Sequence, residues 1–241
     1  MAESIRLVIT LAVSNKWDIR FTDVSTVFLH ADVIGNPYIY PPETENLENT
    51  NIIWKLNKAQ YGLKSAPKAW NQHLTKVLKN LGWTQSILDE CIFFKKKQNI
   101  ENNEESETAT TTDNFPITGL IAVYVDDLIV CGTTETTDEF YKELENSCTI
   151  SPPECLEIDG TAVTFLGFQY SRHKDYVKID PQEYVKKILI AFYCMGCNPR
   201  TAPGQNLVFE IDKRERERYL LDKNEQKKYR KMVGQILWVS S

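Results

Sequence analysis

The chain has 241 residues, of which 42% are hydrophobic and 11% aromatic, which is enough for the core of one large domain or of a domain and a half. Asp126 and Asp127 interrupt the longest apolar run, so no stretch has the length needed to cross a bilayer, and we expect no membrane partner. The six cysteines have no disulfide-framework spacing, which suits a reducing compartment. Cys194 and Cys197 form an isolated CxxC that lacks the further ligands of a zinc site, and we interpret them as ordinary thiols.

The net charge of −5 conceals a strong asymmetry along the chain. Residues 55–97 contain nine lysines and two acidic residues, whereas residues 98–160 contain fifteen acidic residues and one lysine. One surface could therefore attract phosphates while another repels them. A solvated lysine-rich helix would give the same pattern.

The first elements are a helix and a strand. Apolar residues over 4–14 have the spacing of an amphipathic helix. Residues 17–31 begin as an alternating strand and change near Asp23 to a helix-like turn. A carboxylate at the end of a strand, followed by a chain reversal with outward backbone amides, can offer metal and phosphate contacts together. An Asp or Ser N-cap of a helix explains this position equally well.

The next elements carry aromatic residues and lysines. Residues 38–42 are extended, residues 52–56 form a short strand, and a helix opens after Tyr61 and runs to about residue 81, with Pro67 in its first turn. Gly62 lets the backbone approach closely beside Lys64 and Lys68, which suits a base pair and its phosphates. Tyr61 and Trp70 could instead be core aromatics. Residues 92–95 should pair with 118–124, on either side of a mobile acidic loop at 98–116.

Two adjacent carboxylates lie in the middle of the apolar stretch 119–132, which predicts a β-hairpin with a charged tip. Burying an unpaired carboxylate is costly, and two neighbouring carboxylates also repel each other. A divalent cation would neutralise the pair, and oxygen ligands suit Mg²⁺ or Mn²⁺. Asp-Asp is also a common turn dipeptide, so a solvated tip without chemistry is the alternative.

The C-terminal third alternates strands and helices. We expect a helix over 137–147, a strand over 163–170 with its hairpin partner at 176–179, and a helix from the N-cap Asp180 to about residue 193. Residues 198–205 form a linker, and another helix begins at Tyr229.

The three carboxylates can meet if their strands are neighbours in one antiparallel sheet. Asp23, Asp126 and Asp127 would then hold two metal ions, one activating a 3′-hydroxyl and the other binding a triphosphate. The sequence therefore predicts a phosphoryl-transfer site.

Five segments, in this order and spacing, resemble the reverse transcriptase of copia-type LTR retrotransposons. They are Asp23-Val-Ser-Thr-Val-Phe28-Leu, Tyr61-Gly-Leu-Lys-Ser-Ala-Pro-Lys-Ala-Trp70, Tyr124-Val-Asp-Asp127, Phe165-Leu-Gly-Phe168 and Tyr229-Arg-Lys-Met-Val-Gly234. The resemblance implies an α+β fold: a right-hand polymerase palm with an antiparallel sheet and packed helices, partial fingers and the start of the thumb. Palm and partial fingers would occupy 1–172, and residues 173–241 would hold the return of the primer-grip hairpin, a thumb-like part and a connecting segment.

The resemblance also implies roles for individual residues. Asp23, Asp126 and Asp127 correspond to the catalytic carboxylates that bind two Mg²⁺ ions, with Mn²⁺ as a substitute, and Phe28 to the steric gate that favours dNTPs over rNTPs. Ser25, Thr26 and Val27 would line the triphosphate through backbone amides, and Tyr61 and Gly62 would lie behind the nascent base pair. Template and primer contacts would come from Lys64, Lys68, Phe165, Leu166 and Gly167.

The implied activity is RNA-directed DNA polymerisation on a primed RNA or DNA template. Partners would be dNTPs and the remainder of a Pol polyprotein, with its integrase and ribonuclease H, in cytoplasmic virus-like particles or in the nucleus. The sequence departs from the family pattern at Ser65, where glutamine is usual. It is also expected to be truncated at both ends, without the basic fingers segment. The alternative is an inactive retrotransposon remnant that binds nucleic acid or a partner protein.

Overall fold

A computed structural model describes residues 2–42, 52–97, 116–198 and 221–240. The chain divides into two compact units. The first comprises residues 1–166 and 170–178, and the second comprises residues 167–169 and 179–241. The structure is a mixed α+β protein with antiparallel sheets and packed helices, as predicted.

The first unit is built on a six-stranded antiparallel sheet. Its strands are β1 (Asp18–Asp23), β4 (Thr84–Gln85), β5 (Ile92–Lys96), β6 (Ile117–Tyr124), β7 (Asp127–Gly132) and β8 (Glu154–Cys155). They lie in the order β4-β5-β6-β7-β1-β8. The predicted pairing of residues 92–95 with 118–124 is confirmed by the β5–β6 ladder.

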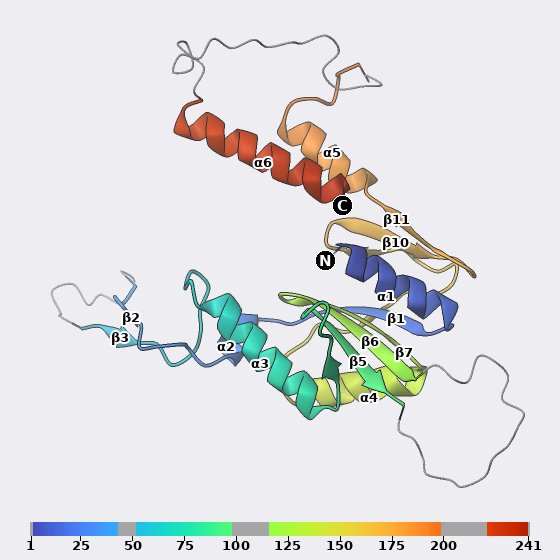
Figure 1. Ribbon diagram of the computed structural model, residues 1–241. Helices are drawn as coiled ribbons and strands as arrows, with labels where there is room; N and C mark the ends of the chain where they lie inside the picture. The colour runs from blue at the N-terminus through green and yellow to red at the C-terminus, as the bar shows by residue number, and fades with distance from the viewer. Residues whose placement is uncertain (1, 43–51, 98–115, 199–220, 241) are drawn as a thin grey trace, which may run out of the picture. The chain divides into compact units, whose positions relative to one another are not determined.

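Helices cover both faces of this sheet (Figure 1). Helix α1 (Ala2–Ser14), predicted over 4–14, packs on β6, β7 and β1 from one side. Helices α3 (Ala66–Asn80) and α4 (Thr134–Leu144) lie on the other side, where their apolar residues join alternate residues of β6 and β7 in the main core. Both central strands are buried on both faces, which explains why their sequences are continuously apolar rather than alternating.

Two glycines that face each other across β6 and β7 make room for the start of α4. Gly119 and Gly132 are register partners. A methyl group on Gly132 would lie 2.8 Å from the backbone oxygen of Thr118, and one on Gly119 would lie 3.0 Å from the side chain of Thr136. The helix–sheet distance therefore depends on these two positions.

The smaller elements of the structure are α2 (Val27–His30), β2 (Tyr38–Ile39), β3 (Trp54–Lys55), β9 (Val163–Phe165), β10 (Phe168–Arg172) and β11 (Val177–Asp180). Strands β2 and β3, at the predicted extended segments, pair in a two-stranded sheet. The other three strands form a sheet with the order β11-β10-β9.

The expected single strand over 163–170 is wrong, because the chain reverses at Leu166 and Gly167. Both residues have positive φ, 49° and 87°, which is the backbone of a two-residue hairpin turn. The predicted hairpin partner after residue 175 is confirmed by β11.

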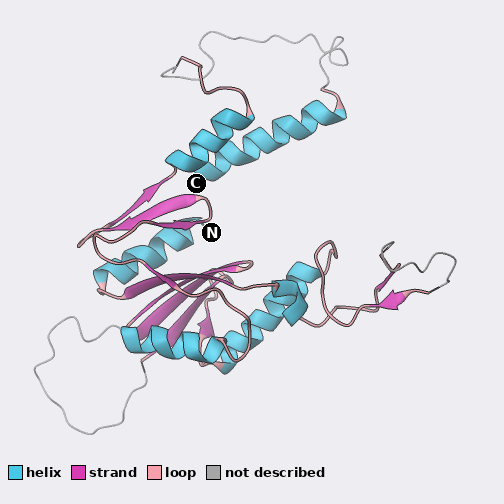
Figure 2. Ribbon diagram, turned by 180° about the vertical axis from the view of Figure 1, so that it is seen from behind, coloured by secondary structure: helices cyan, strands magenta, loops and turns pink. Residues whose placement is uncertain are grey.

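The second unit contains the helix pair α5 (Gln182–Ala191) and α6 (Lys223–Ser240). The N-cap of α5 is Pro181 rather than the expected Asp180, which ends β11. The side chain of Asp180 still accepts a hydrogen bond from the backbone N–H of Gln182 at 2.9 Å. The expected start of α6 at Tyr229 is wrong, because Asp222 and Glu225 form a capping box that starts the helix at Lys223. In Figure 2 both helices are seen from behind.

The acidic loop predicted at 98–116 lies, except for Pro116, outside the described residues, as does most of the predicted linker at 198–205. Among the helices that the structure describes, none combines the length and apolar character needed to cross a membrane.

We expect Gly132→Ala to lower the free energy of unfolding by about 1–3 kcal/mol, because the added methyl group meets backbone atoms that cannot move away. Denaturant unfolding would measure the change. Gly234→Ala is the matched control, since a methyl group there meets no atom within 4 Å and alanine favours the helix. Equal effects of the two substitutions would contradict the close-packing argument.

Candidate active site

The hairpin tip between β6 and β7 lies beside the end of β1. Asp23, the last residue of β1, is the register partner of Asp127, the first residue of β7. The backbone N–H of Val24 donates to the carbonyl of Asp126 at 2.8 Å. The structure therefore brings the backbones of the three acidic residues to one end of the sheet, although more than a hundred residues separate Asp23 from the other two in sequence.

The backbone of Asp23 is fixed from its other side by a segment that the sequence did not single out. Its N–H donates to the hydroxyl oxygen of Ser151 at 2.9 Å, and its carbonyl accepts from the N–H of Ser151 at 2.8 Å. No motif marks Ser151 in the sequence, because its role depends on residues 149–151 lying beside β1.

The two-residue turn at the tip has a strained backbone. Val125 has a φ of 57°, a left-handed conformation that costs a β-branched residue free energy and that glycine or asparagine normally adopts in such turns. The indole N–H of Trp70, on α3, donates to the carbonyl of Val125 at 2.6 Å. Trp70 is 2% exposed, so this hydrogen bond ties the tip to the core.

The prediction that Trp70 is a core aromatic is confirmed, and its indole N–H also positions the hairpin tip. An indole buried in a core usually finds an acceptor. That rule predicts that the indole of Trp70 has a hydrogen-bond acceptor. Only the packing of α3 against the hairpin identifies this acceptor as the carbonyl of Val125.

The carboxylates perturb one another. Partial burial raises the pKa of Asp127 to about 6, with further contributions from the charges of Asp126 and Asp23. The pKa of Asp23 is also raised, first by burial and then by the charge of Asp126. Burial is therefore the larger cause of both shifts, and the neighbouring like charges add to it. A cation bound here would offset the like charges.

The side chains of Asp23, Asp126 and Asp127 offer carboxylate oxygens, which are the ligands that a hard divalent cation prefers. In the described part of the chain, however, no three His, Cys, Asp or Glu side chains are grouped closely enough to hold a metal ion. Asp23 and Asp127 lie opposite each other across the strand pair, and Asp126 lies in the turn.

The segment after Asp23 reverses the chain. The N–H of Ser25 donates to the carbonyl of Thr149 at 2.8 Å, so this amide is already used, contrary to the expectation that it lines a triphosphate. Thr26 has a left-handed φ of 52° and precedes the short helix α2, which Val27 begins.

Phe28 and Tyr61, predicted as the steric gate and a base-pair neighbour, are in contact. Their ring centroids lie 4.5 Å apart in an edge-to-face arrangement. Phe28 is 7% exposed, whereas Tyr61 is 64% exposed. Tyr61 therefore presents the accessible ring, and the left-handed Gly62 (φ 98°) turns the chain beside it.

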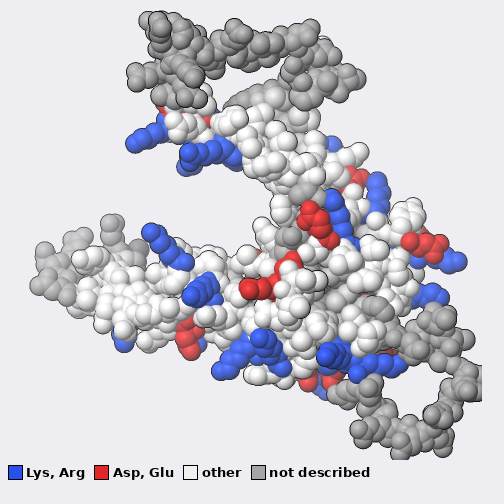
Figure 3. Space-filling view, viewed as in Figure 1, with Lys and Arg blue, Asp and Glu red and all other residues white. Residues whose placement is uncertain are grey.

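The predicted contacts to template and primer lie on separate elements. Lys64 and Lys68 are exposed, before and in the first turn of α3, and Figure 3 shows basic side chains along this part of the unit. The side chain of Phe165 is buried and packs on Phe21, with 4.9 Å between the ring centroids. Leu166 and Gly167 form the half-buried hairpin turn that follows it.

The family described as reverse transcriptase (RNA-dependent DNA polymerase) matches residues 1–206. The chain belongs to this family. The match contains every residue predicted for the site, and it ends before α6.

Related proteins are Pol polyproteins of copia-type transposons, which confirms the resemblance found in the sequence. The retrovirus-related Pol polyprotein from transposon TNT 1-94 of Nicotiana tabacum is 27% identical over 83% of this chain and 14% of its own length. That from transposon RE1 of Arabidopsis thaliana is 28% identical over 83% of this chain and 12% of its own length. The reverse transcriptase chain described here therefore spans less than a sixth of these relatives.

We expect the chemical shift of the side-chain carboxyl carbon of Asp127, followed by NMR against pH, to give a pKa of about 6. Asp23→Asn should shift the midpoint toward the ordinary value of 3.8, because it removes one neighbouring charge. Since the pKa is raised in the folded state, the folded chain binds more protons than the unfolded chain between about pH 4 and 6, and its stability should fall as the pH rises through this window. A midpoint near 3.8 in the unsubstituted chain would contradict the clustering.

We expect Trp70→Phe to lower the free energy of unfolding by about 1–3 kcal/mol beyond the loss of ring area, because it leaves the carbonyl of Val125 without its donor. Hydrogen exchange at the N–H of Val24, which is bonded to Asp126, should become faster. Trp83→Phe is the matched control, since within the described residues the buried indole N–H of Trp83 has no acceptor. Equal exchange at Val24 in both variants would exclude the positioning role.

Proposed function

We propose that this chain is the polymerase part of an RNA-directed DNA polymerase that adds dNTPs to a primer. The observation that carries the proposal is the pairing of Asp23 with Asp127 beside Asp126, in a chain of the reverse transcriptase family. Nucleotidyl transfer needs little covalent chemistry from the protein, so positioned carboxylates are the main requirement.

Asp23, Asp126 and Asp127 would hold two Mg²⁺ ions, or Mn²⁺ in their place. When bound, the ions would supply activation of the primer 3′-hydroxyl and neutralisation of the triphosphate. Asp127 must lose its proton before it can bind a cation, and its pKa of about 6 allows this at neutral pH. Trp70 and Ser151 would hold the backbone that presents these carboxylates.

The incoming nucleotide would lie beside the turn after Asp23. Thr26 and Val27 would offer backbone groups to the triphosphate, and Ser25 would act through its side chain, since its amide is bonded to Thr149. Phe28 would close the space below the sugar and favour a dNTP, with Tyr61 and Gly62 against the base pair. The support is the direct contact between the rings of Phe28 and Tyr61.

Template and primer would be held through charge and through a hairpin turn. Lys64 and Lys68 would contact phosphates, which are attracted to exposed lysines. Leu166 and Gly167 would contact the primer end, while the buried Phe165 would fix the turn by packing on Phe21.

In this proposal residues 1–172 form the palm with part of the fingers, and residues 173–241 form the hairpin return, a thumb-like part and a connecting segment. The chain would act within a Pol polyprotein like those of its relatives, together with integrase and ribonuclease H parts. Its template would be RNA or DNA, in cytoplasmic virus-like particles or in the nucleus.

A second candidate is a module that binds nucleic acid without catalysis. It is favoured by the observation that the described residues contain no close group of three possible metal ligands. The two candidates differ in whether the unsubstituted chain binds Mg²⁺ and extends a primer.

We expect Asp126→Asn to abolish extension of a DNA primer on an RNA template with Mg²⁺ and dNTPs, because a carboxylate ligand is lost, and to leave folding intact. Extension would be measured on gels, and Mg²⁺ binding by calorimetry. Asp175→Asn, at an exposed turn, makes the same change of charge away from the site and should extend primers like the unsubstituted chain. An unsubstituted chain that binds a primed template but neither binds Mg²⁺ nor extends the primer would support the second candidate.

A further inference from the structure

The isolated CxxC lies in a turn directly after α5. The N–H of Cys197 donates to the carbonyl of Cys194 at 3.2 Å, which closes the four-residue turn Cys194-Met-Gly-Cys197. In such a turn the first and last Cα atoms are less than about 7 Å apart. A disulfide needs Cα atoms about 4.4–6.8 Å apart, so the folded backbone already holds the pair in the range for bonding.

The two thiols differ in their surroundings. Cys197 is exposed, whereas Cys194 is half-buried and donates its thiol hydrogen to the carbonyl of Phe192 at 3.3 Å. Burial, followed by the neighbouring Cys197, raises the pKa of the Cys194 thiol. An incoming reagent therefore meets Cys197 first, and Cys194 is placed to react second.

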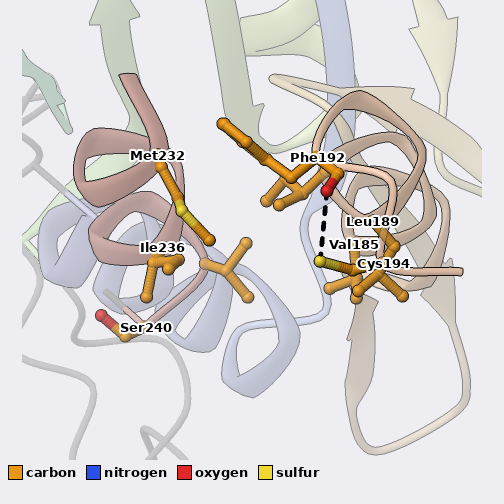
Figure 4. Close-up of a pocket in the computed structure, with 9 residues that line it drawn as sticks. Val185, Leu189, Phe192, Cys194, Met232, Ile236 and Ser240 are labelled. Carbon is orange, nitrogen blue, oxygen red and sulfur yellow. Dashed lines mark hydrogen bonds between the residues drawn. The ribbon is translucent and has the colours of Figure 1, made fainter. Parts of the chain in front are cut away.

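Cys194 also lines an apolar cavity of about 350 Å³ between α5 and α6, shown in Figure 4. The other lining residues include Ile188 from α5, Phe192 at the C-terminal cap of α5, and Met232 and Ile236 from α6. Within the described residues no third His, Cys, Asp or Glu joins the two cysteines to complete a metal site. The chemistry left to the pair is that of a dithiol.

We propose that Cys194 and Cys197 form a reversible dithiol–disulfide site that is oxidised by low-molecular-weight disulfides such as oxidised glutathione. The thiolate of Cys197 attacks the reagent and forms a mixed disulfide, releasing one glutathione thiolate. The thiolate of Cys194 then attacks the sulfur of Cys197 and releases the second. The two cysteines lose two electrons and two protons, and one oxidised glutathione becomes two reduced glutathiones.

The site is independent of the polymerase function, and its closure has a structural consequence. The Cys194 sulfur must leave the carbonyl of Phe192 to bond with Cys197, because its hydrogen is lost. The end of α5 and one wall of the cavity therefore change with the redox state.

Mass spectrometry of the tryptic peptide 188–200, which contains both cysteines and no other, tests the proposal. After the reduced chain is exposed to oxidised glutathione, we expect this peptide to lose two hydrogen atoms and a dithiol reductant to restore them. In Cys194→Ser or Cys197→Ser the remaining cysteine should instead carry one glutathionyl group. The exposed Cys155 should also carry one glutathionyl group. Cys155→Ser should leave formation of the Cys194–Cys197 disulfide unchanged.

Glutathionyl groups on both cysteines of the unsubstituted chain, or two unchanged thiols while Cys155 is modified, would overturn the proposal. A second measurement tests whether the folded turn, and not only the short spacing of the two cysteines in sequence, favours the disulfide. We expect the equilibrium constant for closing the disulfide to be on the order of tenfold larger in the folded chain than in urea, because the turn is already formed. Equal constants would show that the structure does not hold the pair.

Discussion

The hydrogen bond from the indole of Trp70 to the carbonyl of Val125 is the constraint on which the candidate site depends. Val125 is held in a left-handed conformation that a β-branched residue avoids, and such strain persists only where the surroundings enforce it. A fully buried ring on α3 provides this enforcement from the core. The same turn determines where Asp126 and Asp127 lie relative to the end of β1.

The second constraint is the repulsion among the carboxylates. Partial burial is the main cause that raises the pKa of Asp127 to about 6, and the charges of Asp126 and of Asp23, which lies opposite Asp127 in the β1–β7 ladder, raise it further. The central strands β6 and β7 are apolar and buried on both faces, and their facing glycines at 119 and 132 let α4 approach them. The fold thus stores electrostatic strain at one end of a rigid sheet, which is how sites that bind cations are commonly built.

Local patterns predicted most elements because each depends on neighbouring residues. Apolar periodicity gave α1 and the ladder of β5 with β6, and the Asp180-Pro181 pair gave the start of α5. The strand over 163–170 failed because a non-glycine residue, Leu166, adopts a positive φ in the turn, which no local preference indicates. The start of α6 was placed too late because the charged residues before Tyr229 hide the capping box of Asp222 and Glu225.

The sequence by itself determined the family, the hairpin with its carboxylate tip and the identities of the three acidic residues, because motif order and hydrophobic pattern are properties of the chain alone. Tertiary structure decided which residues meet. Only the strand order places Asp23 against Asp127, only the packing of α3 gives Trp70 its acceptor, and only the segment at 149–151 occupies the amide of Ser25. These contacts join residues far apart in sequence, and their geometry depends on the whole sheet rather than on any local preference.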